Sequence, residues 1–182
     1  VELADGGIEL GRREDPYFNR DVYSFCSHQH TPNKPDSATP GMVEGADGIY
    51  IAWNVFEDYA TKGSLVLKKM VVHALNRLLP DKTLSTDLPA QGVVTLQRQP
   101  SESRIVNHLL YASPVKRGEG VEMIEDLLPL HNVTVSVRLP QDNVKRVYLA
   151  PQMTPIEFIR SGERISYTVP QLLCHQMVVI DV

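Results

Sequence analysis

Apolar residues are spaced most regularly in residues 48–80, where a short run of consecutive apolar residues is followed by a helical repeat. Residues 49–53 (IYIAW) form a continuous apolar run, which predicts a short strand buried on both faces. Residues 64–79 place aliphatic side chains three and four positions apart, which predicts a helix with one buried face. Ser64 can cap this helix and Pro80 cannot continue it. The predicted buried face consists of Leu67, Val71, Ala74, Leu75 and Leu78.

The residues just before this strand predict a hairpin that follows a loop. Residues 42–44 and 48–53 flank a glycine-containing turn at residues 45–47, as in a β-hairpin. Residues 31–42 contain three prolines and one glycine. Because proline and glycine favour turns over regular structure, we expect these residues to form a surface loop.

After the helix the period changes from helical to strand-like. Residues 81–91 are polar and form the predicted connection between two domains, residues 1–82 and residues 83–182. Residues 121–132 suit either a short helix or an irregular crossover. Seven short strands with regular turn signals predict an antiparallel β-sandwich. These strands are residues 92–98, 104–113, 133–139, 145–150, 156–160, 164–169 and 176–182.

Composition restricts the classes of partner. The chain has 18 basic and 22 acidic residues, a net charge of −4, so it lacks the basic excess that holds a phosphate backbone. No apolar run approaches the ~20 residues of a membrane-spanning helix. We therefore expect neither nucleic acid nor a membrane as a partner. The chain starts at Val1 and shows no signal peptide, which leaves bacterial cytoplasm and periplasm both open.

Cys26, His28 and His30 are the strongest candidates for chemistry, because alternate residues share one face of a strand. Sulfur and nitrogen at this spacing could hold zinc, but a structural zinc site needs four ligands and no fourth lies nearby. Cys26 lacks the neighbouring glycines of a nucleophile elbow. The sequence contains no glycine-rich loop of the kind that binds phosphate. Glycoside hydrolysis needs two carboxylates across a cleft, and acids adjacent in sequence, such as Glu57 and Asp58, diverge instead. We assign no catalytic residue, no metal and no cofactor.

Aromatic residues gather where the apolar strand ends. Trp53, Phe56 and Tyr59 could stack on a sugar ring, fill an interface or belong to the core. Single aromatic residues on the later strands are expected in the sandwich core. These are Tyr111, Tyr148, Phe158 and Tyr167.

The order of these segments resembles a known family. Residues 17–80, from YFNRDVYSFCSHQHTP to GIYIAWNVFEDYATKGSLVLKKMVVHALNRLLP, resemble the later half of the beta-galactosidase trimerisation domain. That domain has an amidotransferase-like (flavodoxin-like) α/β fold without amidotransferase activity. Residues 83–182 resemble the β-sandwich that follows it in large bacterial glycoside hydrolases, through LPAQGVVTLQRQ, HLLYASPVKRG, VEMIEDLLPLHNVTVSVRLP, VKRVYLAPQ and HQMVVIDV. The resemblance implies an incomplete α/β unit followed by an antiparallel β-sandwich.

The resemblance also implies a role. Enzymes of this kind carry their catalytic carboxylates on an N-terminal (β/α)₈ barrel, which these residues do not include. The implied function is a non-catalytic accessory or oligomerisation region of a beta-galactosidase-like glycoside hydrolase in carbohydrate metabolism. Its partners would be the catalytic barrel of the parent chain and, since half a domain would expose apolar sheet, further copies in a homo-oligomer. The residues expected near substrate or at an interface are His28, Gln29, His30, Trp53 and Asn54.

Two other functions stay open at this point. The β-sandwich could itself bind carbohydrate through exposed aromatic side chains, as a carbohydrate-binding module does. Alternatively, the chain could be a self-contained enzyme that uses Cys26, His28 or His30. Glycan binding by residues 83–182 would favour the first, and hydrolysis of nitrophenyl glycosides by this chain alone would favour the second.

Overall fold

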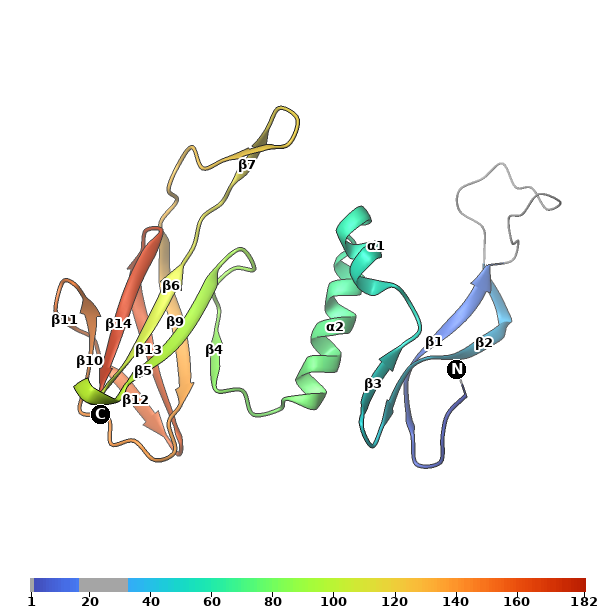
Figure 1. Cartoon of the computed structure of the whole chain (residues 1–182), viewed down its shortest axis with the longest axis horizontal. Helices are drawn as coiled ribbons and strands as arrows, with labels where there is room; N and C mark the ends of the chain where they lie inside the picture. Colours follow the sequence, from blue (N-terminus) through green and yellow to red (C-terminus); the bar gives the residue numbers. More distant parts are fainter. Residues whose placement is uncertain (1, 17–32) are drawn as a thin grey trace. The chain divides into compact units, whose positions relative to one another are not determined.

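The computed structural model describes residues 2–16 and 33–182, and it divides into two compact units (Figure 1). The first unit is Val1–Pro80 and the second is Asp81–Val182. Among the described residues, no helix is both long enough and apolar enough to span a membrane.

The first unit combines one antiparallel sheet with two helices. The sheet has the order β1-β2-β3. The β2–β3 hairpin turns between Gly45 and Gly48, which confirms the predicted hairpin. Gly63 takes the left-handed conformation, with φ of 65°, and separates the two helices. The elements are β1 (Ile8–Pro16), β2 (Asn33–Gly45), β3 (Gly48–Ile51), α1 (Val55–Lys62) and α2 (Leu65–Leu78).

The loop predicted at residues 31–42 is wrong for the part that the structure describes, because β2 begins at Asn33. Two prolines are tolerated in this strand for a topological reason. Strand β3 pairs with β2 only from Met42 onward, so Pro35 and Pro40 have a strand neighbour on the β1 side alone. A proline without an N–H group is accommodated where a strand has a free edge or an irregular register. The β1–β2 ladder has three such register shifts.

The structure does not support the incomplete amidotransferase-like α/β unit. A flavodoxin-like fold needs parallel strands joined by crossover helices, because only a long connection returns the chain to the same end of the sheet. Both strand pairs of the described sheet are antiparallel instead. The helices follow the sheet in sequence and do not connect its strands.

The predicted buried face of α2 is only partly correct. Of its five apolar positions only Ala74 is buried, whereas Leu75 and Leu78 are each 47% exposed. The helix packs against α1 and touches β3. An ion pair also anchors its last turn to the sheet, since Arg77 Nε donates to Glu44 Oε2 at 2.6 Å. The helical spacing therefore predicted the apolar face of α2 correctly, but it did not predict which element covers that face.

The second unit is an antiparallel β-sandwich, as predicted. One sheet has the order β11-β10-β14-β6-β5 and the other has the order β12-β13-β9-β4. A separate hairpin consists of β7 and β8. The strands are β4 (Leu84–Thr86), β5 (Val93–Gln99), β6 (Arg104–Leu110), β7 (Val115–Arg117), β8 (Val121–Met123), β9 (Leu130–Arg138), β10 (Arg146–Ala150), β11 (Thr154–Pro155), β12 (Phe158–Ser161), β13 (Arg164–Leu172) and β14 (His175–Asp181).

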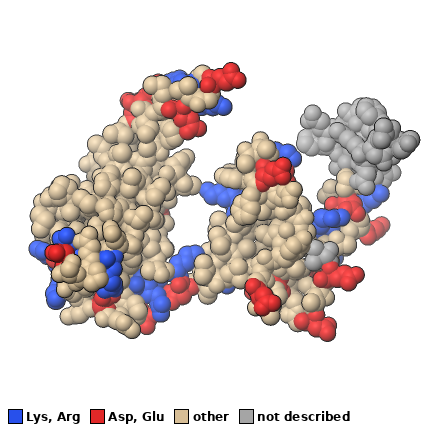
Figure 2. All heavy atoms as spheres, in the orientation of Figure 1, with Lys and Arg blue, Asp and Glu red and all other residues tan. Residues whose placement is uncertain are grey.

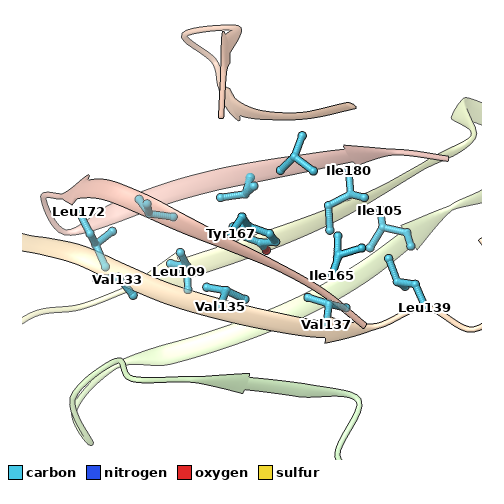
Figure 3. Close-up of a cluster of buried hydrophobic side chains, with 13 residues drawn as sticks. Ile105, Leu109, Val133, Val135, Val137, Leu139, Ile165, Tyr167, Leu172 and Ile180 are labelled. Carbon is cyan, nitrogen blue, oxygen red and sulfur yellow. The ribbon is translucent and has the colours of Figure 1, made fainter. Parts of the chain in front are cut away.

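Alternation along the strands builds the core between the two sheets. On β9, Val133, Val135 and Val137 point inward and lie opposite Val169, Tyr167 and Ile165 of β13. From the other sheet, β6 and β14 contribute aliphatic side chains, among them Ile105, Leu109 and Ile180 (Figure 3). Each fully buried aliphatic side chain contributes about 1.5–3 kcal/mol from burial. Of the predicted core aromatics, Tyr167 is buried in this core, and Tyr111 and Phe158 pack partly buried against it. Tyr148 is buried too, but in a separate cluster with Val106 and Val179, so its assignment to the sandwich core is wrong.

Residues 121–132 contain no helix, so of the two predicted options the irregular crossover is confirmed; it is part of a hairpin arm, residues 114–129. The arm lies between β6 and β9 and thus connects one sheet to the other. Every residue of its strands β7 and β8 is exposed, and the strands project away from the sandwich in Figure 1. The turn contains Gly118 and Gly120, both at positive φ. Figure 2 shows acidic and basic side chains gathered along the arm.

An ion pair at the end of the sandwich predicts a pH dependence. Arg98 Nη1 donates to Asp142 Oδ1 at 2.8 Å, and this contact holds the pKa of Asp142 below its usual value despite partial desolvation. A lowered folded-state pKa stabilises the fold above the unfolded pKa of ~3.9, and that stabilisation disappears as pH falls through the folded value. We expect Asp142→Asn to lower the free energy of unfolding by about 1 kcal/mol at pH 7.

Urea unfolding of both proteins from pH 7 to pH 2 measures this effect. The two stabilities should converge as the pH falls below about 4, and Asp126→Asn on the exposed arm should match the wild type throughout. A difference of constant size across the whole range would show that Asp142 acts by something other than its charge.

Candidate functional site

The structure describes two of the five residues predicted to lie near substrate or at an interface. His28, Gln29 and His30 lie outside the described residues, as does Cys26. Trp53 and Asn54 are described, and they join the end of β3 to the start of α1. Trp53 is partly buried, and Asn54 is exposed.

Gly41 of β2 sets the position of Trp53. The Ala52 N–H group donates to the Gly41 carbonyl oxygen at 2.8 Å, which brings the residue before Trp53 against the sheet. A Cβ atom at position 41 would lie 2.7 Å from Cη2 of the indole and 3.0 Å from the backbone nitrogen of Arg13. A Cβ atom essentially never lies 2.7 Å from another heavy atom, and 3.0 Å is tighter than most Cβ contacts. The indole therefore rests on a site that only glycine leaves open.

The indole borders an open groove of about 520 Å³. One wall comes from β3 through Ile49 and Ile51, and the opposite wall comes from α2 through Val71, Ala74 and Leu75. The segment from Trp53 to Glu57 closes one end, with Phe56 73% exposed. The indole also borders a second hollow of about 480 Å³, which Met42, Lys69 and His73 help to line. Trp53 thus lines two hollows.

Asn54 and Glu57 provide the polar groups of the groove. The Asn54 carbonyl oxygen accepts a hydrogen bond from the Asp58 N–H group at 2.9 Å and so begins helix α1. Its side-chain Nδ2 donates to Glu57 Oε2 at 3.4 Å. Glu57 is the only titratable residue in the described lining of the groove. An amide, a carboxylate and aromatic rings can bind a hydroxylated ligand, but glycoside hydrolysis needs two carboxyl groups across the bond.

The described residues also contain no cluster of three or more His, Cys, Asp or Glu side chains that could hold a metal ion. The predicted Cys26, His28 and His30 arrangement falls outside that part of the chain and stays a prediction. Sequence reasoning did not identify the α2 wall of the groove, formed by Val71, Ala74 and Leu75. The helical spacing of these residues could have indicated the wall, but it was interpreted as packing against a core.

The comparisons with known proteins include a close likeness to a solved structure. No family model and no curated protein matches the chain. Among solved structures it is 68% identical to alpha-L-fucosidase isoenzyme 2 from Paenibacillus thiaminolyticus, with a TM-score of 0.90 over 96% of this chain and 27% of that chain. A cycloisomaltooligosaccharide glucanotransferase from Paenibacillus sp. is 16% identical over 53% of this chain and 16% of that chain, with a TM-score of 0.40, which is too low to support an argument.

The likeness refines the expectation from the sequence. A relationship to a glycoside hydrolase is supported, whereas the beta-galactosidase trimerisation type is not confirmed. Nearly the whole chain, in sequence and in fold, is closely similar to about a quarter (27%) of the length of an alpha-L-fucosidase.

Proposed function

We propose that this chain acts as a non-catalytic accessory region of an alpha-L-fucosidase-like glycoside hydrolase, attached to a catalytic domain of the same polypeptide. One observation carries the proposal: 68% identity across 96% of this chain, matched to only 27% of the fucosidase. At that identity the matched part has the same fold, and most of the enzyme's length is left for the catalytic machinery.

The described residues support a role in assembly over a role in bond cleavage. The groove beside Trp53 offers Glu57 as its single carboxylate, so it lacks the second acid that a glycosidase needs. Helix α2 exposes several large apolar side chains, which favours a covering partner, either the catalytic domain or a further copy in a homo-oligomer. These side chains are Leu65, Val66, Val72, Leu75 and Leu78. We retain His28, Gln29, His30, Trp53 and Asn54 as the residues near substrate or at such an interface.

The geometry does not favour the alternative of a carbohydrate-binding β-sandwich. Stacking on a sugar ring needs an exposed aromatic face. The second unit contains four aromatic residues of the Phe, Trp and Tyr types, and all four are buried or partly buried. The exposed aromatic side chains of the described chain, Tyr50, Phe56 and Tyr59, belong to the first unit. If carbohydrate is bound, the groove beside Trp53 is the better candidate.

A chimera tests the proposed function. The matching segment of the Paenibacillus thiaminolyticus fucosidase is replaced by this chain, and hydrolysis of 4-nitrophenyl α-L-fucoside is measured. We expect kcat/KM of the chimera to stay within about tenfold of the fucosidase, because 68% identity preserves the fold of the exchanged segment. This chain alone should show no hydrolysis, and deletion of the segment should abolish it.

The proposal would fail if this chain alone cleaved the fucoside, or if a correctly folded chimera were inactive. The same chimera tests the proposed residues. Trp53→Ala and His28→Ala should each raise KM or shift the oligomeric state measured by light scattering. His131→Ala, an exposed histidine of β9, is the matched control and should change neither.

A further inference from the structure

Two histidines that are far apart in the sequence lie against each other on the sandwich surface. His108 of β6 and His175 of β14 bring Nδ1 and Nε2 within 3.1 Å. Their ring planes are only 7° from parallel, and the ring centroids are 5.4 Å apart. The centroid separation exceeds the nitrogen separation by about two ring radii, so the two nitrogens face each other in line. The rings meet edge to edge and share one proton position.

The strand register explains this arrangement. Strands β6 and β14 are antiparallel, with Leu110 opposite His175 and His108 opposite Met177. His108 and His175 are therefore diagonal neighbours on one face of the sheet, where side chains of this length come into contact. Asn107 and Leu109, on either side of His108, are fully buried on the opposite face. The core thus fixes the backbone beneath both imidazoles.

We propose that His108 and His175 form a two-histidine binding site for a divalent transition-metal ion such as Ni²⁺, Cu²⁺ or Zn²⁺. A metal–nitrogen bond is about 2.0–2.1 Å long. Two nitrogens 3.1 Å apart then subtend an angle of roughly 100° at the metal, between the square-planar and tetrahedral values. His175 is exposed and His108 is half-buried, so both rings can turn until their lone pairs meet at the ion. The ion replaces the proton that the two nitrogens share in its absence.

The surroundings determine which ions fit. Neutral imidazole suits nickel, copper and zinc, whereas calcium and magnesium need oxygen ligands. No carboxylate joins the pair in a cluster of three within the described chain. Met177, across from His108, packs on the apolar cluster of Val106, Tyr148 and Val179 instead. Water fills the other coordination positions, so the site is open to an external ligand.

Titration with NiCl₂ alone, measured by calorimetry at pH 7.5, tests this site in the full chain. His28→Gln and His30→Gln are introduced first in every protein, so that these two histidines, which are close in sequence, do not bind the ion. In that background, His108→Gln or His175→Gln should weaken Ni²⁺ binding at least about tenfold, because the second imidazole acts at high effective concentration. The double substitution should weaken binding little further. His131→Gln serves as the matched control and should leave binding unchanged.

A second measurement needs no substitution at the pair. Substoichiometric Ni²⁺ is paramagnetic and should broaden the imidazole proton resonances of His108 and His175 before those of His73 and His131. Circular dichroism without metal confirms that each variant is folded. Equal Ni²⁺ affinity in the His108, His175 and His131 variants, or equal broadening of all these histidines, would overturn the proposal.

Discussion

Asn107→Ala is expected to lower the free energy of unfolding of the β-sandwich by about 3–4 kcal/mol. Asn107 is fully buried and links the two sheets. Its Oδ1 accepts a hydrogen bond from the Tyr167 hydroxyl at 2.8 Å, and its Nδ2 donates to the Thr95 carbonyl oxygen at 2.8 Å. The alanine removes the buried acceptor of the Tyr167 hydroxyl and the donor of the part-buried Thr95 carbonyl oxygen, and it adds a cavity. Burial raises the pKa of Tyr167, so its hydroxyl stays a donor across the ordinary pH range.

Tyr167→Phe separates the two contributions at Asn107. Tyr167→Phe should lower the free energy of unfolding by less than Asn107→Ala does, about 1–2 kcal/mol, because the hydrogen bond from Asn107 to Thr95 and the packing of the ring both remain. Gln97→Ala, an exposed position on the neighbouring strand β5, should change stability by less than about 0.5 kcal/mol. Urea unfolding followed by far-ultraviolet circular dichroism measures all three. If Asn107→Ala were no more destabilising than Gln97→Ala, the buried link would not matter to the sandwich.

Gly41→Ala is expected to displace Trp53 and destabilise the first unit by about 1–3 kcal/mol. The new methyl group would lie 2.7 Å from the indole and 3.0 Å from the backbone nitrogen of Arg13. The indole can move, but the β1 backbone is held by its pairing with β2. The groove and the second hollow should change shape together, since the indole borders both.

Intrinsic fluorescence reports this change directly, because Trp53 is the only tryptophan among the 182 residues. We expect a red-shifted emission and an earlier urea midpoint in Gly41→Ala. Gly45→Ala is the matched control on the same strand, where an added Cβ meets nothing within 4 Å. Identical spectra and midpoints for the two variants would show that the contact between Gly41 and Trp53 does not hold the indole.

The β-sandwich was predictable because its strands carry a local signal. Valine at every second position of β9 marks an inward face, whichever strand lies opposite. The β2–β3 hairpin was predictable for the same reason, since its turn and flanking residues are adjacent in sequence. In contrast, β2 was missed because proline is a strong local signal for a loop, and only the one-sided pairing of residues 33–41 makes it acceptable.

The functional features depended on information that a single sequence does not contain. Trp53 and Asn54 were recognised because aromatic and polar residues follow an apolar strand, but the α2 wall of their groove was interpreted as core. The spacing of Leu75 and Leu78 marks an apolar face and says nothing of its partner. The His108–His175 pair spans 67 residues, and only the register between β6 and β14 brings the two together.

The arm at residues 114–129 has a consequence for how the sandwich could be divided. Before the arm, β4 belongs to one sheet and β5 and β6 belong to the other. After the arm, the chain again supplies strands to both sheets. A break at Glu119, between the two turn glycines, would leave two fragments that each contribute to both layers of the same core. The chain should therefore tolerate new termini in the arm, and the two fragments should associate to form the intact sandwich.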